Sequence, residues 1–216
     1  MGKEIEAKFL EVDAKELRKN IIDIGGKLVH PLMLYKRYAF FLINKKQKGY
    51  ARVRQENGKV TMTIKTYDES KYANEYEVEL NNSLEEAKEF MVSAGFIVKA
   101  YQETLREKWS ITGCSEIVID TVPGIPTYVE LECNSEENIK KLAKKLGLDY
   151  SKANYGAFDK QFVQYYGLSA NQINNKITML TFRNIINELK PYLKKNKELL
   201  KNISKEQLLL YKKAKK

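Results

Sequence analysis

The sequence predicts an α+β protein: a closed, eight-stranded antiparallel β-barrel with flanking helices and a C-terminal helical extension. Three observations lead to this fold class. About eight segments alternate apolar and polar residues and follow one another in hairpin order. Helix signals interrupt them at only a few connections. No internal repeat and no low-complexity stretch points to a different architecture.

Local signals define the elements of the first half of the chain. Capping boxes that begin at Asp13 and Ser83 predict the starts of two helices, which glycines at 25–26 and 95 end. The pair Asn57 and Gly58 is typical of a tight hairpin turn. Strands are predicted over residues 3–10, 32–43, 50–56, 60–66 and 73–80.

The second half continues the same order. A long strand, or two with a bend between them, is predicted over residues 96–111, followed by strands over 116–122 and 127–133 around a Pro-Gly turn. Ser135 is predicted to cap a helix that runs to Leu146 and ends at Gly147. A short helix is predicted over residues 157–166.

Composition narrows the protein class. A chain of 216 residues with 43% hydrophobic and 11% aromatic residues is typical of a folded globular protein. No apolar run is long enough to cross a membrane and the start is charged, so we expect a cytoplasmic protein. Cys114 and Cys133 have neither metal-ligand nor disulfide-framework spacing and are expected to be reduced. His30, the only histidine, is expected in a surface loop.

The net charge of +10 is concentrated at the C-terminus. From Ala170 onwards there are 12 basic and 3 acidic residues, against 26 and 25 before. The sequence therefore divides into a domain over residues 1–167 and a basic helical extension over 168–216. We expect this tail to form a helical pair, kinked at Pro191, that packs on the barrel or on a partner in a homodimer. A contact with RNA or an anionic surface is the alternative.

The charged residues of the strands recur at a spacing of two. Successive side chains of a strand point to opposite faces, so each such group shares one face of its strand. If these faces line the barrel interior, they form one charged cavity. Its cations are Lys8, Arg52, Arg54, Lys65, Arg106 and Lys108, and its anions are Glu4, Glu6, Glu75, Glu77, Asp120, Glu130 and Glu132.

Such an interior needs a ligand, because each unpaired buried charge costs several kcal/mol. Arginine and lysine bind phosphate oxygens, and clustered carboxylates hold Mg²⁺ or Mn²⁺. A polyphosphate with a divalent metal ion satisfies both sets. A single charged face, by contrast, would be an ordinary solvent-exposed surface.

The stretch Glu4-Ile-Glu6-Ala-Lys8 resembles the ExExK signature of the CYTH family, also called triphosphate tunnel metalloenzymes. The similarity continues through further charged pairs over residues 1–167. Those pairs are Arg52 with Arg54, Glu75 with Glu77, Arg106 with Lys108, and Glu130 with Glu132, together with Lys65 and Asp120. The resemblance implies an eight-stranded tunnel that acts on triphosphates with Mg²⁺ or Mn²⁺.

Residue roles follow from the resemblance. It implies metal ligation by Glu4, Glu6, Asp120, Glu130 and Glu132, and triphosphate binding by Lys8, Arg52, Arg54, Lys65, Arg106 and Lys108. Within these sets Glu4, Glu6, Lys8, Arg106 and Lys108 are the candidate catalytic residues, while Glu75 and Glu77 would orient the cations. Trp109 is expected to pack outside the lumen. Tyr38 is expected to be a core aromatic residue, in preference to a residue that orients the nucleophile.

Three functions fit these residues. The leading prediction is a metal-dependent phosphohydrolase acting on inorganic tripolyphosphate or on a nucleoside or thiamine triphosphate. The second is a class IV type adenylyl cyclase, which Arg106 favours because family hydrolases often carry a lysine there and arginine is a poor general base. The third is a polyphosphate- or nucleotide-binding module without turnover.

Overall fold

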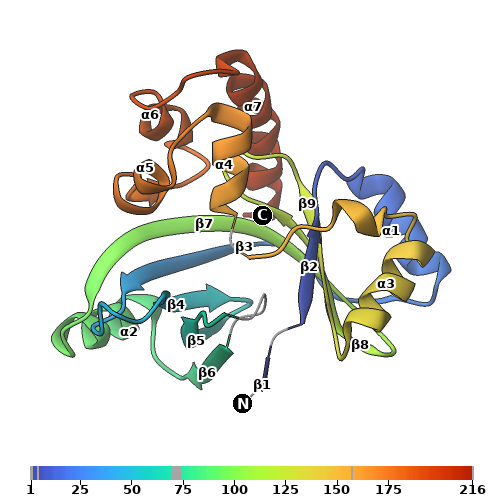
Figure 1. Cartoon of the computed structure of the whole chain (residues 1–216), viewed down its shortest axis with the longest axis horizontal. Coiled ribbons are helices and arrows are strands. Elements are labelled where there is room, and N and C mark those ends of the chain that lie inside the picture. Colours follow the sequence, from blue (N-terminus) through green and yellow to red (C-terminus); the bar gives the residue numbers. More distant parts are fainter. Residues whose placement is uncertain (1, 4, 70–73, 157, 216) are drawn as a thin grey trace.

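The computed structural model describes residues 2, 3, 5–69, 74–156 and 158–215. Its centre is one sheet that curls around an interior space (Figure 1), with the hydrogen-bonded order β1-β6-β5-β4-β3-β7-β8-β9-β2. All neighbours along this path are antiparallel. The strands are β1 (Gly2–Lys3), β2 (Glu6–Phe9), β3 (Lys27–Phe41), β4 (Gly49–Glu56), β5 (Lys59–Thr66), β6 (Asn74–Leu80), β7 (Ile97–Ile111), β8 (Cys114–Thr121) and β9 (Tyr128–Cys133).

The antiparallel fold is confirmed, whereas the described residues show no continuous ladder that closes it. The path is open, and its two ends, β1 and β2, are successive segments of the N-terminal stretch. β1 pairs with β6 through Gly2 and Glu75, and β2 pairs with β9 through Lys8 and Glu130. One N-terminal segment therefore lies against both ends of the curled sheet. Glu4, between these two pairings, lies outside the described residues.

Helices cover the outer faces of the sheet. They are α1 (Ala14–Asp23), α2 (Leu84–Ser93), α3 (Glu136–Lys145) and α4 (Asp159–Tyr166), with a 3₁₀ turn η1 (Tyr150–Lys152) between the last two. The side chains of Asp13, Ser83 and Ser135 accept backbone N–H groups at the starts of α1, α2 and α3. Such caps satisfy donors that the first turn of a helix leaves free.

The outward residues of the strands form apolar cores with these helices. Ala7 and Leu131, which alternate with charged neighbours, pack with α1 and α3, and Val53 packs with α2. Trp109 lies in the α1–α3 cluster, outside the interior space as predicted. Since one parity of each strand is committed to these cores, the opposite, charged parity must face inwards.

The C-terminal tail lies above β7 in Figure 1, partly on the outer face of the sheet and partly at the edge of the interior space. It comprises α5 (Ala170–Asn175), β10 (Met179–Leu180), α6 (Ile185–Leu189) and α7 (Lys197–Ala214). β10 pairs in parallel with β7, and Phe182 packs in one cluster with Leu105 and Tyr211. The side chain of Gln207 donates to the carbonyls of Val122 and Ile125 and accepts from Gly124 N–H. The tail is thus tied to the sheet by packing and by hydrogen bonds.

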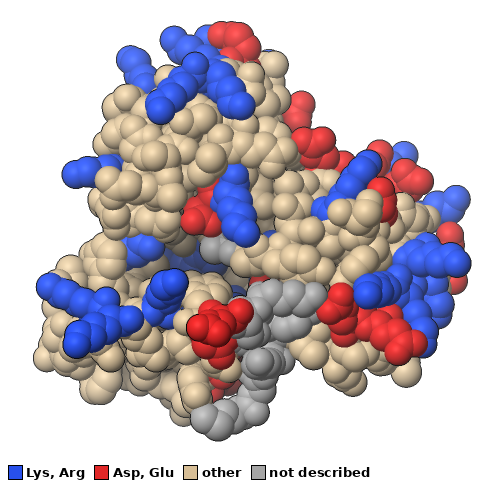
Figure 2. All heavy atoms as spheres, in the orientation of Figure 1, with Lys and Arg blue, Asp and Glu red and all other residues tan. Residues whose placement is uncertain are grey.

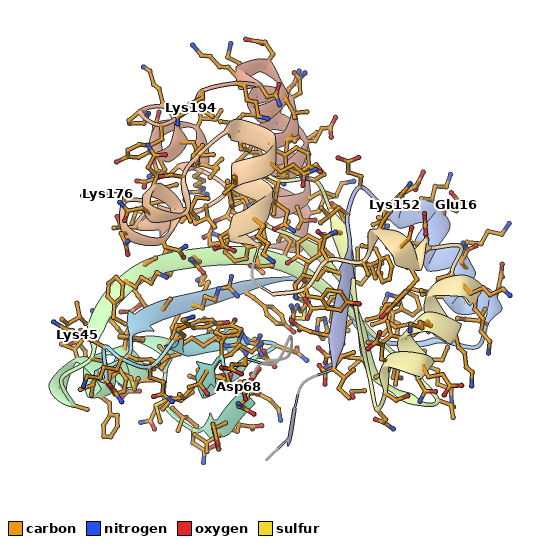
Figure 3. All side chains as sticks on the ribbon, viewed as in Figure 1. Glu16, Lys45, Asp68, Lys152, Lys176 and Lys194 are labelled. Carbon is orange, nitrogen blue, oxygen red and sulfur yellow. A yellow bond between two sulfur atoms is a disulfide. The ribbon has the colours of Figure 1, made fainter. Side chains whose placement is uncertain are left out.

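The basic residues of the tail gather on its outer side. Figure 2 shows Lys and Arg side chains over the part of the molecule formed by α6 and α7. Lys194, labelled in Figure 3, lies on this outer side and away from the interior of the sheet. The predicted homodimer and the predicted RNA or anionic-surface contact stay predictions. Within the described ranges, no helix is long and apolar enough to cross a membrane.

Two expectations from the sequence are wrong. Cys114 and Cys133 are not reduced but form a disulfide, because the antiparallel register of β8 and β9 places them opposite each other. His30 is not a surface loop residue but lies in β3 with 6% of its surface exposed. Its Nδ1 hydrogen-bonds to the Pro31 carbonyl and its Nε2 to the hydroxyl of Tyr35, so both ring nitrogens have partners.

Candidate active site

The curled sheet encloses a cavity of about 480 Å³, a volume suited to a small molecule. Side chains from both halves of the sheet converge on this space (Figure 3). Figure 2 shows it as a hollow beneath the tail, with blue side chains in its depth. All six predicted cations and six of the seven predicted anions line it: Lys8, Arg52, Arg54, Lys65, Arg106, Lys108, Glu6, Glu75, Glu77, Asp120, Glu130 and Glu132.

Lys8 joins two carboxylates on one wall. Its ammonium lies 2.7 Å from Glu6 Oε1 and 2.8 Å from Glu130 Oε2. Burial alone would lower the pKa of Lys8, but Glu130 and Glu6 raise it well above its usual value. Burial would raise the pKa of Glu130, but Lys8 and Arg106 hold it well below its usual range. This lysine is therefore a fixed positive charge and Glu130 a fixed negative one.

The opposite wall holds a second set of pairs. The Arg52 guanidinium donates to Glu75 at 3.2 Å, to Glu77 at 3.3 Å and to the Thr63 hydroxyl at 3.2 Å. Lys65 lies 2.9 Å from Glu75. These groups are cross-strand neighbours on β4, β5 and β6, since Thr63 pairs with both Arg52 and Glu77 and Lys65 pairs with Glu75. Glu75 and Glu77 thus hold two cations in place.

Asp120 and Arg106 form a bidentate ion pair across β7 and β8. Arg106 Nε donates to Asp120 Oδ1 at 2.8 Å and Nη2 to Oδ2 at 2.6 Å. Both oxygens of this carboxylate are therefore engaged by a guanidinium. Burial opposes the charge of Arg106, but Asp120 raises its pKa well above the usual value, so it stays protonated. Lys108 pairs in turn with Glu116, which the sequence reasoning did not select.

Carboxylates crowd together at one end of the cavity. Glu132 lies directly opposite Glu116 on the neighbouring strand. Burial, followed by the charges of Glu116, Glu130 and Glu6, raises the pKa of Glu132 to about 7. Burial and Glu130 likewise raise the pKa of Glu6. Negative charge is thus in excess here, and a cation would relieve it.

These oxygen donors have the chemistry that Mg²⁺ and Mn²⁺ prefer. Glu6, Glu130 and Glu132 are the described residues that would hold such an ion. Across residues 2–3, 5–69, 74–156 and 158–215, no three acidic, histidine or cysteine side chains form a ready-made metal site. To bind here, an ion would therefore need Glu6 or Glu130, which are now paired with Lys8, or Glu4 as ligands.

Two polar atoms of the cavity wall have no partner among the described residues. Arg54 Nε and Thr104 Oγ1 are buried without a hydrogen bond. Burial, followed by the nearby charges of Arg52 and Arg106, lowers the pKa of Arg54 to about 10. Orphaned polar atoms of this kind are rare and call for an explanation. An anionic ligand would satisfy both the guanidinium of Arg54 and the hydroxyl of Thr104.

Arg37 is a cavity residue that the sequence reasoning missed. It lies on β3, donates from Nε to Gln102 Oε1 at 2.7 Å, and sits 5.4 Å from the centre of the Phe158 ring. No carboxylate in the part of the chain that the structure describes lies within ion-pair distance of its guanidinium. Tyr38, on the other face of β3, points away from the cavity and donates to Glu85. The tyrosine expected to pack in the core therefore takes no part in the site.

Comparison with known proteins agrees with this geometry. The model of the CYTH domain matches residues 2–161. This chain belongs to the CYTH family. Among curated proteins, the comparison finds no significant match.

Solved structures share the CYTH fold of this chain. A conserved hypothetical protein from Pyrococcus furiosus has a TM-score of 0.60 at 21% identity, over 72% of this chain and 97% of that one. A proposed adenylate cyclase from Vibrio parahaemolyticus has a TM-score of 0.60 at 12% identity, over 75% and 98%. Another from Bacillus halodurans has a TM-score of 0.53 at 21% identity, over 75% and 99%. At these identities the likeness concerns the fold.

Proposed function

We propose that this CYTH protein is a metal-dependent phosphohydrolase that acts on a triphosphate inside the charged cavity. The observation that carries the proposal is the division of the cavity wall. Cations and unpartnered donors occupy β3, β4, β5 and β7, while excess carboxylates occupy β2, β8 and β9. A phosphate chain would lie against the first set and a divalent metal ion against the second.

The residues of the chain would act by position and charge. Arg52, Arg54 and Lys65 would bind non-bridging phosphate oxygens, and Arg37 would bind a further one. Arg106, held by Asp120, would keep its charge at all working pH values and stabilise the charge that develops during in-line phosphoryl transfer. When bound, the metal ion would neutralise phosphate oxygens and lower the pKa of a bound water.

A class IV type adenylyl cyclase is the second candidate, and one observation favours it. Arg106 is fixed as a guanidinium, so it supplies no general base for the activation of water. A cyclase instead uses the 3′-hydroxyl of its own substrate as the nucleophile. The neighbours with TM-scores of 0.60 and 0.53 that are described as adenylate cyclases are compatible with this alternative.

The products of the reaction distinguish the candidates. Purified protein is incubated with Mg²⁺ or Mn²⁺ and with tripolyphosphate, ATP, GTP or thiamine triphosphate. Release of orthophosphate supports the hydrolase, and cyclic nucleotide with pyrophosphate supports the cyclase. Tight binding without product would leave a binding module. Glu130→Gln should abolish turnover; if that variant kept full activity, the metal assignment would be wrong.

A further inference from the structure

A second region of the cavity lies where the C-terminal tail covers the sheet. Its lining includes Phe158 and Asp159 at the start of α4, Ile173 and Asn174 in α5, and Ile177 just after α5. The last three lie beyond residue 161, where the match to the family model ends. This end of the cavity is therefore built in part by residues that the match to the family model does not reach.

A chain of hydrogen bonds crosses this region. Lys99 Nζ donates to Asn174 Oδ1 at 3.1 Å, and Asn174 Nδ2 donates to Asp159 Oδ2 at 3.2 Å. The amide of Asn174 thus holds an ammonium and a carboxylate at the cavity wall. An ammonium has three donors and a carboxylate about four acceptor positions, so both end groups keep capacity for a ligand. A ligand here would meet a donor and an acceptor on the same wall.

The surfaces around this chain are apolar. Ile173 and Ile177 are 9% and 6% exposed, and Phe158 presents an aromatic ring. On the sheet side, Ala39 and Ala100 line the cavity with small side chains. An apolar slot with a few placed polar groups is how proteins bind the organic part of a small molecule. A phosphate group would find fewer charged partners here than between β4, β5 and β6.

The charges of this region discriminate between organic groups. Lys99 and Arg37 contribute two positive charges, and Asp159 contributes one negative charge. Arg37 lies over the ring of Phe158, 5.4 Å from its centre, and so adds its positive charge to this region. A cationic heterocycle would be repelled by this excess of positive charge, whereas a neutral one would not. The phosphate chain attached to a neutral ring would instead be attracted to Arg37.

We propose that Lys99, Phe158, Asp159, Asn174 and Ile177 form an organic-group subsite that binds the neutral nitrogen heterocycle of a nucleoside triphosphate. The inference rests on the proposed function and narrows it to one substrate class. A nucleoside triphosphate should be preferred to inorganic tripolyphosphate, which leaves the subsite empty. It should also be preferred to thiamine triphosphate, whose ring carries a positive charge.

The test measures selectivity, not activity alone. We compare kcat/KM for ATP and for tripolyphosphate, with Mg²⁺, in the wild type and in Asn174→Leu, which keeps the side-chain size and removes both hydrogen bonds. The ATP value should fall about ten-fold, the effect of about one lost hydrogen bond, and the tripolyphosphate value should stay within about two-fold. Asn175→Leu is the matched control, because that exposed amide contacts Asn171 and lies outside the cavity lining.

A second variant tests the subsite in case Asn174→Leu disrupts α5. Phe158→Leu keeps an apolar side chain and removes the ring, and it should again lower the ATP value more than the tripolyphosphate value. Dissociation constants for both ligands, measured by calorimetry, give the same ratio without turnover. A wild type that prefers tripolyphosphate to ATP, or variants that change both ligands equally, would overturn the subsite. Absence of binding by either ligand would refute the proposed function itself.

Discussion

Replacing Asp120 gives the sharpest prediction, because its ion pair with Arg106 is enclosed and bidentate. The two hydrogen bonds measure 2.8 and 2.6 Å, and the side chains are 15% exposed for Arg106 and 2% exposed for Asp120. Asp120→Asn keeps the shape of the side chain and removes its charge. We expect it to lower the free energy of unfolding while leaving the guanidinium in place.

The magnitude follows from the surroundings of the pair. Removing one partner of a buried ion pair costs about 3–5 kcal/mol, since the other charge is left uncompensated. Glu130 and Glu116 also lie near Arg106 and would offset part of that loss. We therefore expect the lower end of the range, about 3 kcal/mol. Saturating tripolyphosphate should reduce the deficit, because phosphate oxygens would take the place of the lost carboxylate.

Urea unfolding, followed by circular dichroism in EDTA, measures this loss. Glu79→Gln is the control: Glu79 continues the inward face of β6 and pairs with Lys59 at 2.8 Å, but the two side chains are 53% and 60% exposed. Exposed pairs contribute little, so this variant should unfold with the wild type. If Asp120→Asn also matched the wild type, or if its deficit were unchanged by tripolyphosphate, the assignment of Asp120 to holding Arg106 for phosphate would be refuted.

Three further variants test other parts of the site and fold. Glu132→Gln should not change stability at pH 4.5 but should raise it by about 1 kcal/mol at pH 8 in urea unfolding without metal. The reason is that the pKa of Glu132 is raised to about 7 in the folded state, so the folded protein holds this proton more tightly than the unfolded chain does. The free energy of unfolding of the wild type therefore falls as the pH rises towards 7, and the figure of about 1 kcal/mol allows for the partial exposure of Glu132. Arg37→Met should weaken tripolyphosphate binding about ten-fold, as measured by calorimetry, without lowering the melting temperature. The reason is that it removes a cation that has no carboxylate partner among the described residues. A large loss of stability would show that Arg37 has a structural role instead. Gln207→Leu should lower the free energy of unfolding by about 2–3 kcal/mol in urea, because it leaves two carbonyls and one N–H unpaired. A loss near zero would mean that this contact of the tail does not stabilise the sheet.

The alternation of charged residues was enough to predict most of the cavity wall. In β4, for example, Arg52 and Arg54 must share a face, and Ala51 and Val53 are the apolar face that a helix covers. Two residues of the same parity on one regular strand cannot be separated without breaking the ladder. Glu116 could have been found in the same way, because it shares the parity of Asp120 on β8.

Where the strand is irregular, the same reasoning fails. β3 pairs with β7 through register shifts near His30 and Ala39. These shifts interrupt the period of two, so the position of His30 could not be read from the sequence. Lys36 and Arg37 are adjacent and both basic, so composition did not indicate which of them faces inwards. Only the observed pairing, in which Arg37 lies opposite Arg54 and Gln102, identifies the cavity residue.

Contacts between segments that are distant in the chain could not be predicted from the sequence either. Cys114 and Cys133 are 19 residues apart, and nothing in that spacing indicates that a hairpin register places them opposite each other. The cavity lining by Asn174 depends on how α5 packs beside α4, through hydrophobic contacts that carry no sequence signature of their own. The tail could be recognised as helical and basic, but its contribution to the site follows only from its place above β7.

The charge balance of the cavity explains why carboxylates and cations must occur together. The described lining contains eight Lys and Arg and nine Asp and Glu residues, so the cavity without ligand is neutralised by internal pairs such as Lys8 with Glu130. A triphosphate alone would take cations from these pairs and leave several carboxylates uncompensated, at a cost of several kcal/mol each. A divalent ion alone would likewise leave Lys8 without a carboxylate partner. When both bind, the Lys and Arg side chains pair with phosphate oxygens in place of carboxylates. The carboxylates pair with the metal ion in place of ammonium groups, so every charge keeps a partner. The binding of metal and triphosphate should therefore be positively coupled by the internal ion pairs that each of them breaks.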